Sequence, residues 1–60
     1  MNLIIVAREY DGKARTLDYG KSMSLALRAL NTLWTGKQWQ SLILKDSDGH
    51  IIEVRRRYNR

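Results

Sequence analysis

The sequence predicts an α+β protein of the order ββαββ, in which a four-stranded antiparallel sheet carries one helix packed on one face. Two Asp-Gly pairs, Asp11-Gly12 and Asp48-Gly49, each stand between apolar runs, and this dipeptide is typical of tight β-hairpin turns. Between them, one segment spaces its apolar residues as an amphipathic helix does. No proline or linker divides the 60 residues, so we expect a single domain over residues 1–60 that frays at its last few residues.

The order of the strands follows from their composition. The runs "LIIV" at 3–6 and "LIL" at 42–44 are apolar on both faces, as central strands often are, whereas the other two strands carry charges, as edge strands do. This favours the strand order 2-1-3-4. The predicted hairpins join residues 2–10 to 13–19 and residues 38–47 to 50–58.

The register of the sheet depends on the length of the two turns. If each turn has two residues, directly opposite residues share one face, so that Val6 faces Leu17 and Ile43 faces Val54. The same register pairs Ile4 with Tyr19, Lys45 with Ile52, and Trp39 with Tyr58. The face that we expect under the helix then consists of Ile4, Val6, Leu17, Tyr19, Trp39, Ile43, Ile52 and Val54.

The helix is predicted between Ser22, which can cap its first turn, and Gly36, which can end it. Its buried side should be the apolar stripe at helical spacing. That stripe consists of Met23, Leu27, Leu30 and Trp34, flanked by Ala26 and Leu33.

The opposite sheet face would then expose an apolar strip that the helix does not cover. Monomers rarely expose contiguous apolar areas of more than a few hundred Å², so the strip predicts an interface with a second copy or with a larger protein. Two alternatives remain open: the register slips by one residue at a bulge, or arginine stems lie across the strip. The expected interface residues are Leu3, Ile5, Leu42 and Leu44, with Ala7 between them.

The charge of the chain favours anionic partners. Eleven Lys and Arg residues against six Asp and Glu residues give a net charge of +5, and the predicted topology gathers most of the cations, Lys37 and Arg60 among them, at one end of the sheet. Guanidinium groups match phosphate oxygens. The predicted nucleic-acid site consists of Arg8, Lys13, Arg15, Arg55, Arg56 and Arg57, with Tyr58 as a stacking group. The alternative is that the arginines only keep an edge strand soluble.

Other classes of function find little support in the sequence. The single histidine, His50, stands beside a turn, no acidic pair is placed for acid/base catalysis, and there is no cysteine, so we expect no enzyme, no metal site, no cofactor and no small-molecule substrate. "DSDG" at 46–49 lacks the closing glutamate of a calcium loop. No apolar run is long enough to cross a membrane, and the start lacks the features of a signal peptide, so we expect a cytoplasmic protein without a membrane partner.

The sequence therefore predicts a small, basic, non-enzymatic binding protein. The leading hypothesis is nucleic-acid binding, to DNA or RNA, through phosphate contacts with weak sequence specificity. The alternative is a protein-interaction module, such as an inhibitor or regulator, that docks through the open face of the sheet and forms a homodimer or joins a larger partner.

Overall fold

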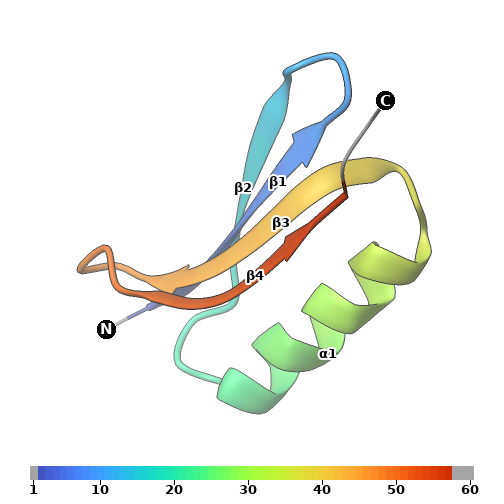
Figure 1. Cartoon of the computed structure of the whole chain (residues 1–60). Helices are drawn as coiled ribbons and strands as arrows, with labels where there is room; N and C mark the ends of the chain where they lie inside the picture. The colour runs from blue at the N-terminus through green and yellow to red at the C-terminus, as the bar shows by residue number, and fades with distance from the viewer. Residues whose placement is uncertain (1, 58–60) are drawn as a thin grey trace.

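A computed structural model describes residues 2–57 as two layers, a twisted sheet and one helix beneath it (Figure 1). The four strands form one antiparallel sheet in the order β2-β1-β3-β4. The predicted fold class and strand order are therefore confirmed. Within residues 2–57, no helix is long and apolar enough to cross a membrane. The elements are β1 (Leu3–Glu9), β2 (Ala14–Asp18), α1 (Met23–Thr35), β3 (Trp39–Asp46) and β4 (Ile51–Arg56).

Both hairpin turns contain three residues, not the two that were expected. In the first turn the Gly12 N–H donates to the Glu9 carbonyl at 3.1 Å, and the Glu9 N–H donates to the Lys13 carbonyl at 2.7 Å. Gly12 has φ of +96°. A turn of this kind ends in a left-handed residue, which glycine adopts without steric cost. The second turn repeats the pattern, with Gly49 at φ of +94°.

The longer first turn shifts β2 by one residue against β1. Val6 lies opposite Thr16, and Ile5 lies opposite Leu17, so the expected pairing of Val6 with Leu17 is wrong. A shift of one residue moves every side chain of a strand to the other face of the sheet. As a result, Leu17 joins the face that carries Ile5, and Tyr19, whose N–H donates to the Leu3 carbonyl at 2.8 Å, follows it.

Two irregularities adjust the register of β3. At its start Glu9 pairs with Trp39 although Arg8 pairs with Ser41, so Gln40 between them is bulged. The bulge turns Trp39 from the face that carries Ile43 to the face that carries Leu42. Near its end a second bulge compensates for the three-residue turn. The expected pairing of Ile43 with Val54 is therefore confirmed, whereas Lys45 pairs with Ile51 and not with Ile52; the predicted partner of Trp39, Tyr58, lies outside the described residues.

The helix covers the sheet face that was expected to be open. The strip predicted as an interface is the hydrophobic core, in which Ile5, Leu42 and Leu44 are fully buried. The prediction was wrong because the turn and the bulge bring Leu17, Tyr19 and Trp39 to this face, where the helix then packs. The buried cluster consists of Leu3, Ile5, Ala7, Ala26, Leu30, Trp39, Leu42 and Leu44. Ile4, Val6, Ile43 and Val54 lie on the opposite face, and Ile52 is exposed.

The predicted ends of the helix are confirmed, but its buried stripe is rotated. The Ser22 hydroxyl accepts a hydrogen bond from the Leu25 N–H at 3.3 Å, and the Gly36 N–H donates to the Leu33 carbonyl at 3.2 Å. Ala26 and Leu30 are fully buried. Met23 and Leu27, which were expected at the centre of the stripe, are 41% and 40% exposed.

Lys37 follows the helix with φ of +60°, the left-handed conformation that is usually left to glycine at this position. We predict that Lys37→Gly raises the free energy of unfolding by about 0.5–1 kcal/mol, since the left-handed conformation costs an L-residue roughly 1–2 kcal/mol and glycine gives back part of this as chain entropy. Urea denaturation followed by circular dichroism measures the change. Lys37→Ala removes the same side chain but keeps the strain, so an equal gain in that variant would contradict the backbone explanation.

Candidate functional site

The sheet face away from the helix is uncovered in the described chain, and we call it the open sheet face. It consists of three rows of residues that run across the strands in the order β2, β1, β3 and β4. The rows are Asp18, Ile4, Lys45 and Ile51; Thr16, Val6, Ile43 and Val54; and Ala14, Arg8, Ser41 and Arg56.

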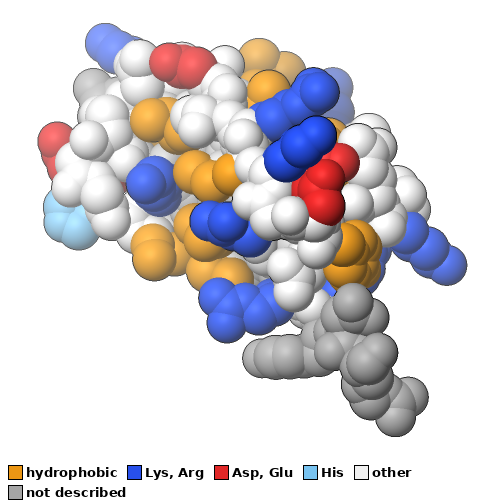
Figure 2. Space-filling model, turned by 90° about the horizontal axis from the view of Figure 1, so that it is seen from above, with side chains coloured by type: hydrophobic (Ala, Val, Ile, Leu, Met, Phe, Trp, Pro, Cys, Tyr) orange, Lys and Arg blue, Asp and Glu red, His pale blue; other side chains and the backbone are white. Residues whose placement is uncertain are grey.

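Aliphatic side chains occupy the middle of the open sheet face. Val6 and Ile43 lie next to each other on the two central strands and are half-buried by their neighbours. Towards the β4 edge the exposure rises, to 43% for Val54 and 62% for Ile51. In the view from above, hydrophobic side chains accordingly appear in the middle of the surface, with Lys and Arg side chains among and around them (Figure 2). No aromatic residue of the described chain belongs to the three rows.

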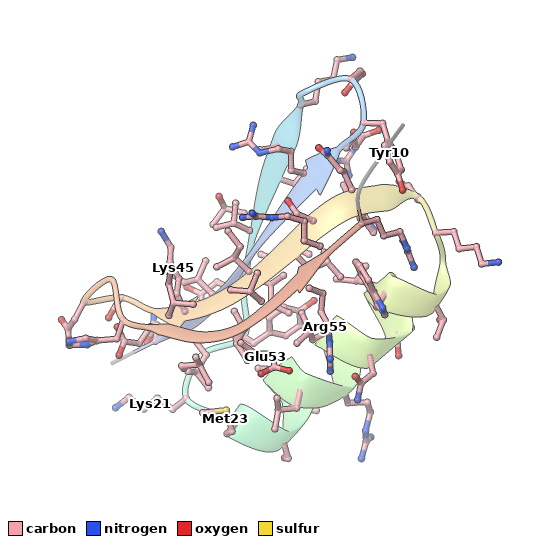
Figure 3. The ribbon with its side chains drawn as sticks, viewed as in Figure 1. Tyr10, Lys21, Met23, Lys45, Glu53 and Arg55 are labelled. Atoms are coloured by element: carbon pink, nitrogen blue, oxygen red, sulfur yellow. The ribbon has the colours of Figure 1, made fainter. Side chains whose placement is uncertain are left out.

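The charges on this face are mostly positive. Arg8 and Arg56 flank Ser41 in one row, and Lys45 projects from the side of the sheet away from the helix (Figure 3). The only carboxylate in the three rows, that of Asp18, already accepts hydrogen bonds from the Gly20 N–H at 2.7 Å and from a neighbouring side-chain amide. The face therefore combines an aliphatic centre with a cationic border.

The three consecutive arginines do not act together. Alternation along β4 places Arg56 on the open sheet face and turns Arg55 towards the helix (Figure 3). The Arg55 guanidinium lies 3.3 Å from the Glu53 carboxylate and donates to the Asn31 side-chain oxygen at 3.3 Å. It is therefore engaged within the protein.

Arg57 joins the end of β4 to the end of the helix. Its guanidinium stacks 3.8 Å above the Trp34 ring and donates to the carbonyls of Trp34 and Trp39, the latter at 3.0 Å. The last carbonyls of a helix have no partner within it, and the last turn of α1 contains no basic residue. Arg57 thus supplies from the sheet the cation that favours a helix C-terminus.

The predicted nucleic-acid site is therefore divided. Arg55 and Arg57 bind the helix, whereas the remaining four cations of that site stay exposed. Arg15 lies opposite Ala7, so it belongs to the helix side of the sheet. Tyr58 and Arg60 lie outside the described residues. The exposed cations are Arg8, Lys13, Arg15 and Arg56.

Sequence reasoning named the wrong residues for the apolar surface. Leu3, Ile5, Leu42 and Leu44 are at most 5% exposed, so in this fold they cannot form an interface. The surface that takes their place contains Ile4, Val6, Ile43, Val54 and Ile51. The available signal was that both central strands are apolar on both faces, which predicts an uncovered apolar strip without deciding which face it occupies.

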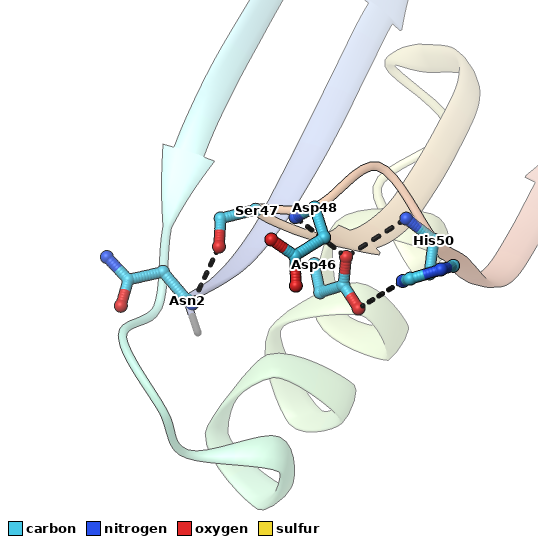
Figure 4. A network of polar contacts seen from close by, with 5 residues as sticks. All are labelled: Asn2, Asp46, Ser47, Asp48 and His50. Carbon is cyan, nitrogen blue, oxygen red and sulfur yellow. Dashed lines mark hydrogen bonds and ion pairs between the residues drawn. The ribbon is translucent and has the colours of Figure 1, made fainter.

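The turn between β3 and β4 brings three potential metal ligands, Asp46, Asp48 and His50, within 4.8 Å of one another. The Asp46 carboxylate accepts the N–H groups of Asp48 and His50 at 2.9 Å and faces the imidazole at 3.2 Å (Figure 4). These donors lower the pKa of Asp46, the His50 N–H most, although desolvation opposes the shift. Stabilisation of the turn accounts for this cluster.

Comparison with protein-family models, with curated proteins and with solved structures finds no match for this chain. The class that the fold itself defines is a small two-layer α+β protein with one helix and an uncovered sheet face.

We predict that Arg57→Lys lowers the free energy of unfolding by about 1–2 kcal/mol, because lysine cannot stack on Trp34 and reach two carbonyls with one planar group. Urea denaturation measures the effect. Arg56→Lys, on the open sheet face, is the matched control and should change stability by less than about 0.5 kcal/mol. Equal effects of the two substitutions would show that the contacts of Arg57 do not stabilise the fold.

Acid should weaken the β3–β4 turn through Asp46. Because its pKa is lower in the folded chain than in the unfolded one, its charge stabilises the fold above the unfolded value of 3.8, and this contribution is lost as the pH falls through the folded value. Asp46→Asn keeps an accepting oxygen without the charge. We predict a smaller loss of thermal stability between about pH 5 and pH 2 in this variant than in the wild type. Asp48→Asn makes the same change of charge in the same turn and is the matched control; an equal reduction in both variants would contradict a specific role of Asp46.

Proposed function

We propose that the chain is a non-enzymatic protein-interaction module that docks its open sheet face onto an acidic protein surface. The observation that carries the proposal is the layout of that face, in which aliphatic side chains in the centre are bordered by cations. A complementary partner presents apolar side chains in the centre and carboxylates at the border. Such an arrangement derives affinity from the desolvated centre and orientation from the charges around it.

The exposure of the aliphatic side chains supports a protein partner. Val54 and Ile51 are 43% and 62% exposed and adjoin the half-buried side chains of Val6 and Ile43. Each square ångström of apolar surface removed from water contributes roughly 25 cal/mol, so a partner that covers these side chains gains more than one that touches only the charged border. Phosphates alone would leave the aliphatic centre in water.

The charge pattern argues against a second copy on this face. A twofold interface brings the same surface of two chains together, so Arg8, Lys45 and Arg56 of one copy would face a surface whose charged groups are the same three cations and one carboxylate. Juxtaposed like charges suppress association. Since the carboxylate of Asp18 is the only one in the three rows, a self-complementary charge pattern is missing, and an acidic partner fits better.

Nucleic-acid binding is the second candidate. Arg8, Lys13 and Arg15 are exposed around the turn between β1 and β2, and the last residues of β4 run towards the same end of the sheet (Figure 1). With a net charge of +5, these side chains favour any polyanion. Nucleic-acid binding ranks second because two arginines of the run contact the helix and the three rows contain no aromatic residue for base stacking.

We predict that a photo-crosslinking phenylalanine derivative at Val54 forms protein adducts in a nuclease-treated lysate of the source cells, and that the adducts are enriched in acidic proteins. Ile43→Ser, which removes the aliphatic centre, and the double variant Arg8→Glu/Arg56→Glu should each weaken binding to the identified partner at least tenfold. The same crosslinker at Thr35, on the outer side of the helix, is the matched control and should not capture this partner.

Oligonucleotide titrations separate the two candidates. If labelled single- or double-stranded oligonucleotides bind with a steep salt dependence that decreases in Arg8→Gln and Arg56→Gln, nucleic acid is the partner, and the docking proposal is wrong. The docking proposal also fails if adducts at Val54 and Thr35 contain the same proteins.

A further inference from the structure

A groove lies along the helix, on the side of the sheet that the helix covers. It has a volume of about 400 Å³, within the size range of ligand sites, and it is open to solvent. One helix face lines most of it, at the spacing i, i+3, i+4, i+7 and i+8, and Tyr19, directly after β2, supplies one wall. The lining residues are Tyr19, Leu25, Arg28, Ala29, Thr32 and Leu33.

The groove exists because the helix is not centred on the sheet. α1 packs on β1 and β3, and on the β4 side it is held by the contacts of Arg55 and Arg57. Its β2 side is left without a second element. There Leu25 is 53% exposed, and the small side chain of Ala29 leaves a hollow between Leu25 and Leu33.

The polar side-chain groups that line the groove have no partners within residues 2–57. The Arg28 guanidinium takes part in none of the ion pairs and hydrogen bonds of these residues, unlike Arg8, Arg55 and Arg57. The hydroxyls of Thr32 and Tyr19 are likewise without a side-chain hydrogen bond there. Arg28 and Thr32 stand one helical turn apart on the same side of the helix.

The composition of the helix makes this site electropositive. α1 contains no acidic residue, and Arg28 is its one charged side chain. A ligand that lies in the groove therefore meets apolar side chains along its length and a guanidinium with a neighbouring hydroxyl at one border. Charge-assisted hydrogen bonds from such a pair suit a carboxylate.

We propose that this groove binds a small amphipathic carboxylate, with its hydrocarbon part over Leu25, Ala29 and Leu33 and its head group at Arg28 and Thr32. The site is separate from the open sheet face, so it is independent of the proposed docking partner. Because the groove is open on one side, it covers only part of a ligand, and the affinity is that of a weak, reversible site.

Titration of the ¹⁵N-labelled chain with decanoate, below its micelle-forming concentration, tests the proposal by NMR. Amide shifts should saturate and should be largest between residues 25 and 33. Arg28→Gln should weaken binding about tenfold, since it removes a charged hydrogen-bond donor, and Thr32→Val should weaken it less. Both positions are exposed, so the variants should fold, which circular dichroism verifies. Arg56→Gln makes the same charge change on the opposite sheet face and should leave the decanoate affinity unchanged.

The head group and the tail are tested separately. Decylammonium, with the same tail and the opposite charge, should not bind the groove, and acetate, with the head group alone, should cause no saturating shifts. The proposal is overturned if decanoate shifts do not saturate or map outside the groove. Equal weakening in Arg28→Gln and Arg56→Gln overturns it too, because the attraction would then be only a general effect of net charge.

Discussion

The turn at Asp11-Gly12 decides which face of the sheet becomes the core. Glycine at φ of +96° closes a three-residue turn, and the resulting register places Leu17 beside Ile5. With a two-residue turn the same strand would present Leu17 to the other face, next to Val6. Together with the bulge at the start of β3, this adds Leu17 and Trp39 to the face that carries Ile5. The helix packs where the most apolar surface can be removed from water.

The position of the helix on that face depends on a polar contact at the edge of the sheet. Arg57 connects β4 to the last carbonyls of α1, and Arg55 reaches Asn31 one turn earlier in the helix. These two arginines can therefore lie on the helix side of an edge strand without displacing apolar side chains from the core. Their guanidinium groups donate hydrogen bonds to the helix, including a carbonyl at its end. The same contacts draw the helix towards β4 and away from β2. They thereby create both the division of the arginine run and the groove beside Tyr19.

The fold class and strand order were predictable because they depend on local and compositional signals. The Asp-Gly pairs marked both hairpins, Ser22 and Gly36 marked the helix, and doubly apolar strands marked the centre of the sheet. The choice of face was not predictable from these signals. Since β1 and β3 are apolar on both sides, their composition is compatible with either face under the helix, and a single residue in a turn reverses the outcome. The predicted apolar interface inherited this error, because its residues lie under the helix. Composition likewise could not show that Arg55 and Arg57 contact the helix, which leaves Arg8, Lys13, Arg15 and Arg56 exposed among the predicted cations.

Exposed aliphatic side chains on one sheet face are costly in a domain with so small a core. A chain of this length buries only about 60% of the surface that its unfolded form exposes, so aliphatic side chains on an uncovered face are surface that the core cannot use. Threonine at Ile43 and Val54 would keep the strand propensity, and lysine would increase solubility. Either residue would avoid an exposed apolar row. The cationic border has a separate consequence, because Arg8, Lys45 and Arg56 raise the repulsion between two copies that approach through this face. In the proposed docking, an aliphatic centre promotes association and a like-charged border restricts it to oppositely charged surfaces. On this proposal the combination favours a partner of complementary charge over aggregation with a second copy.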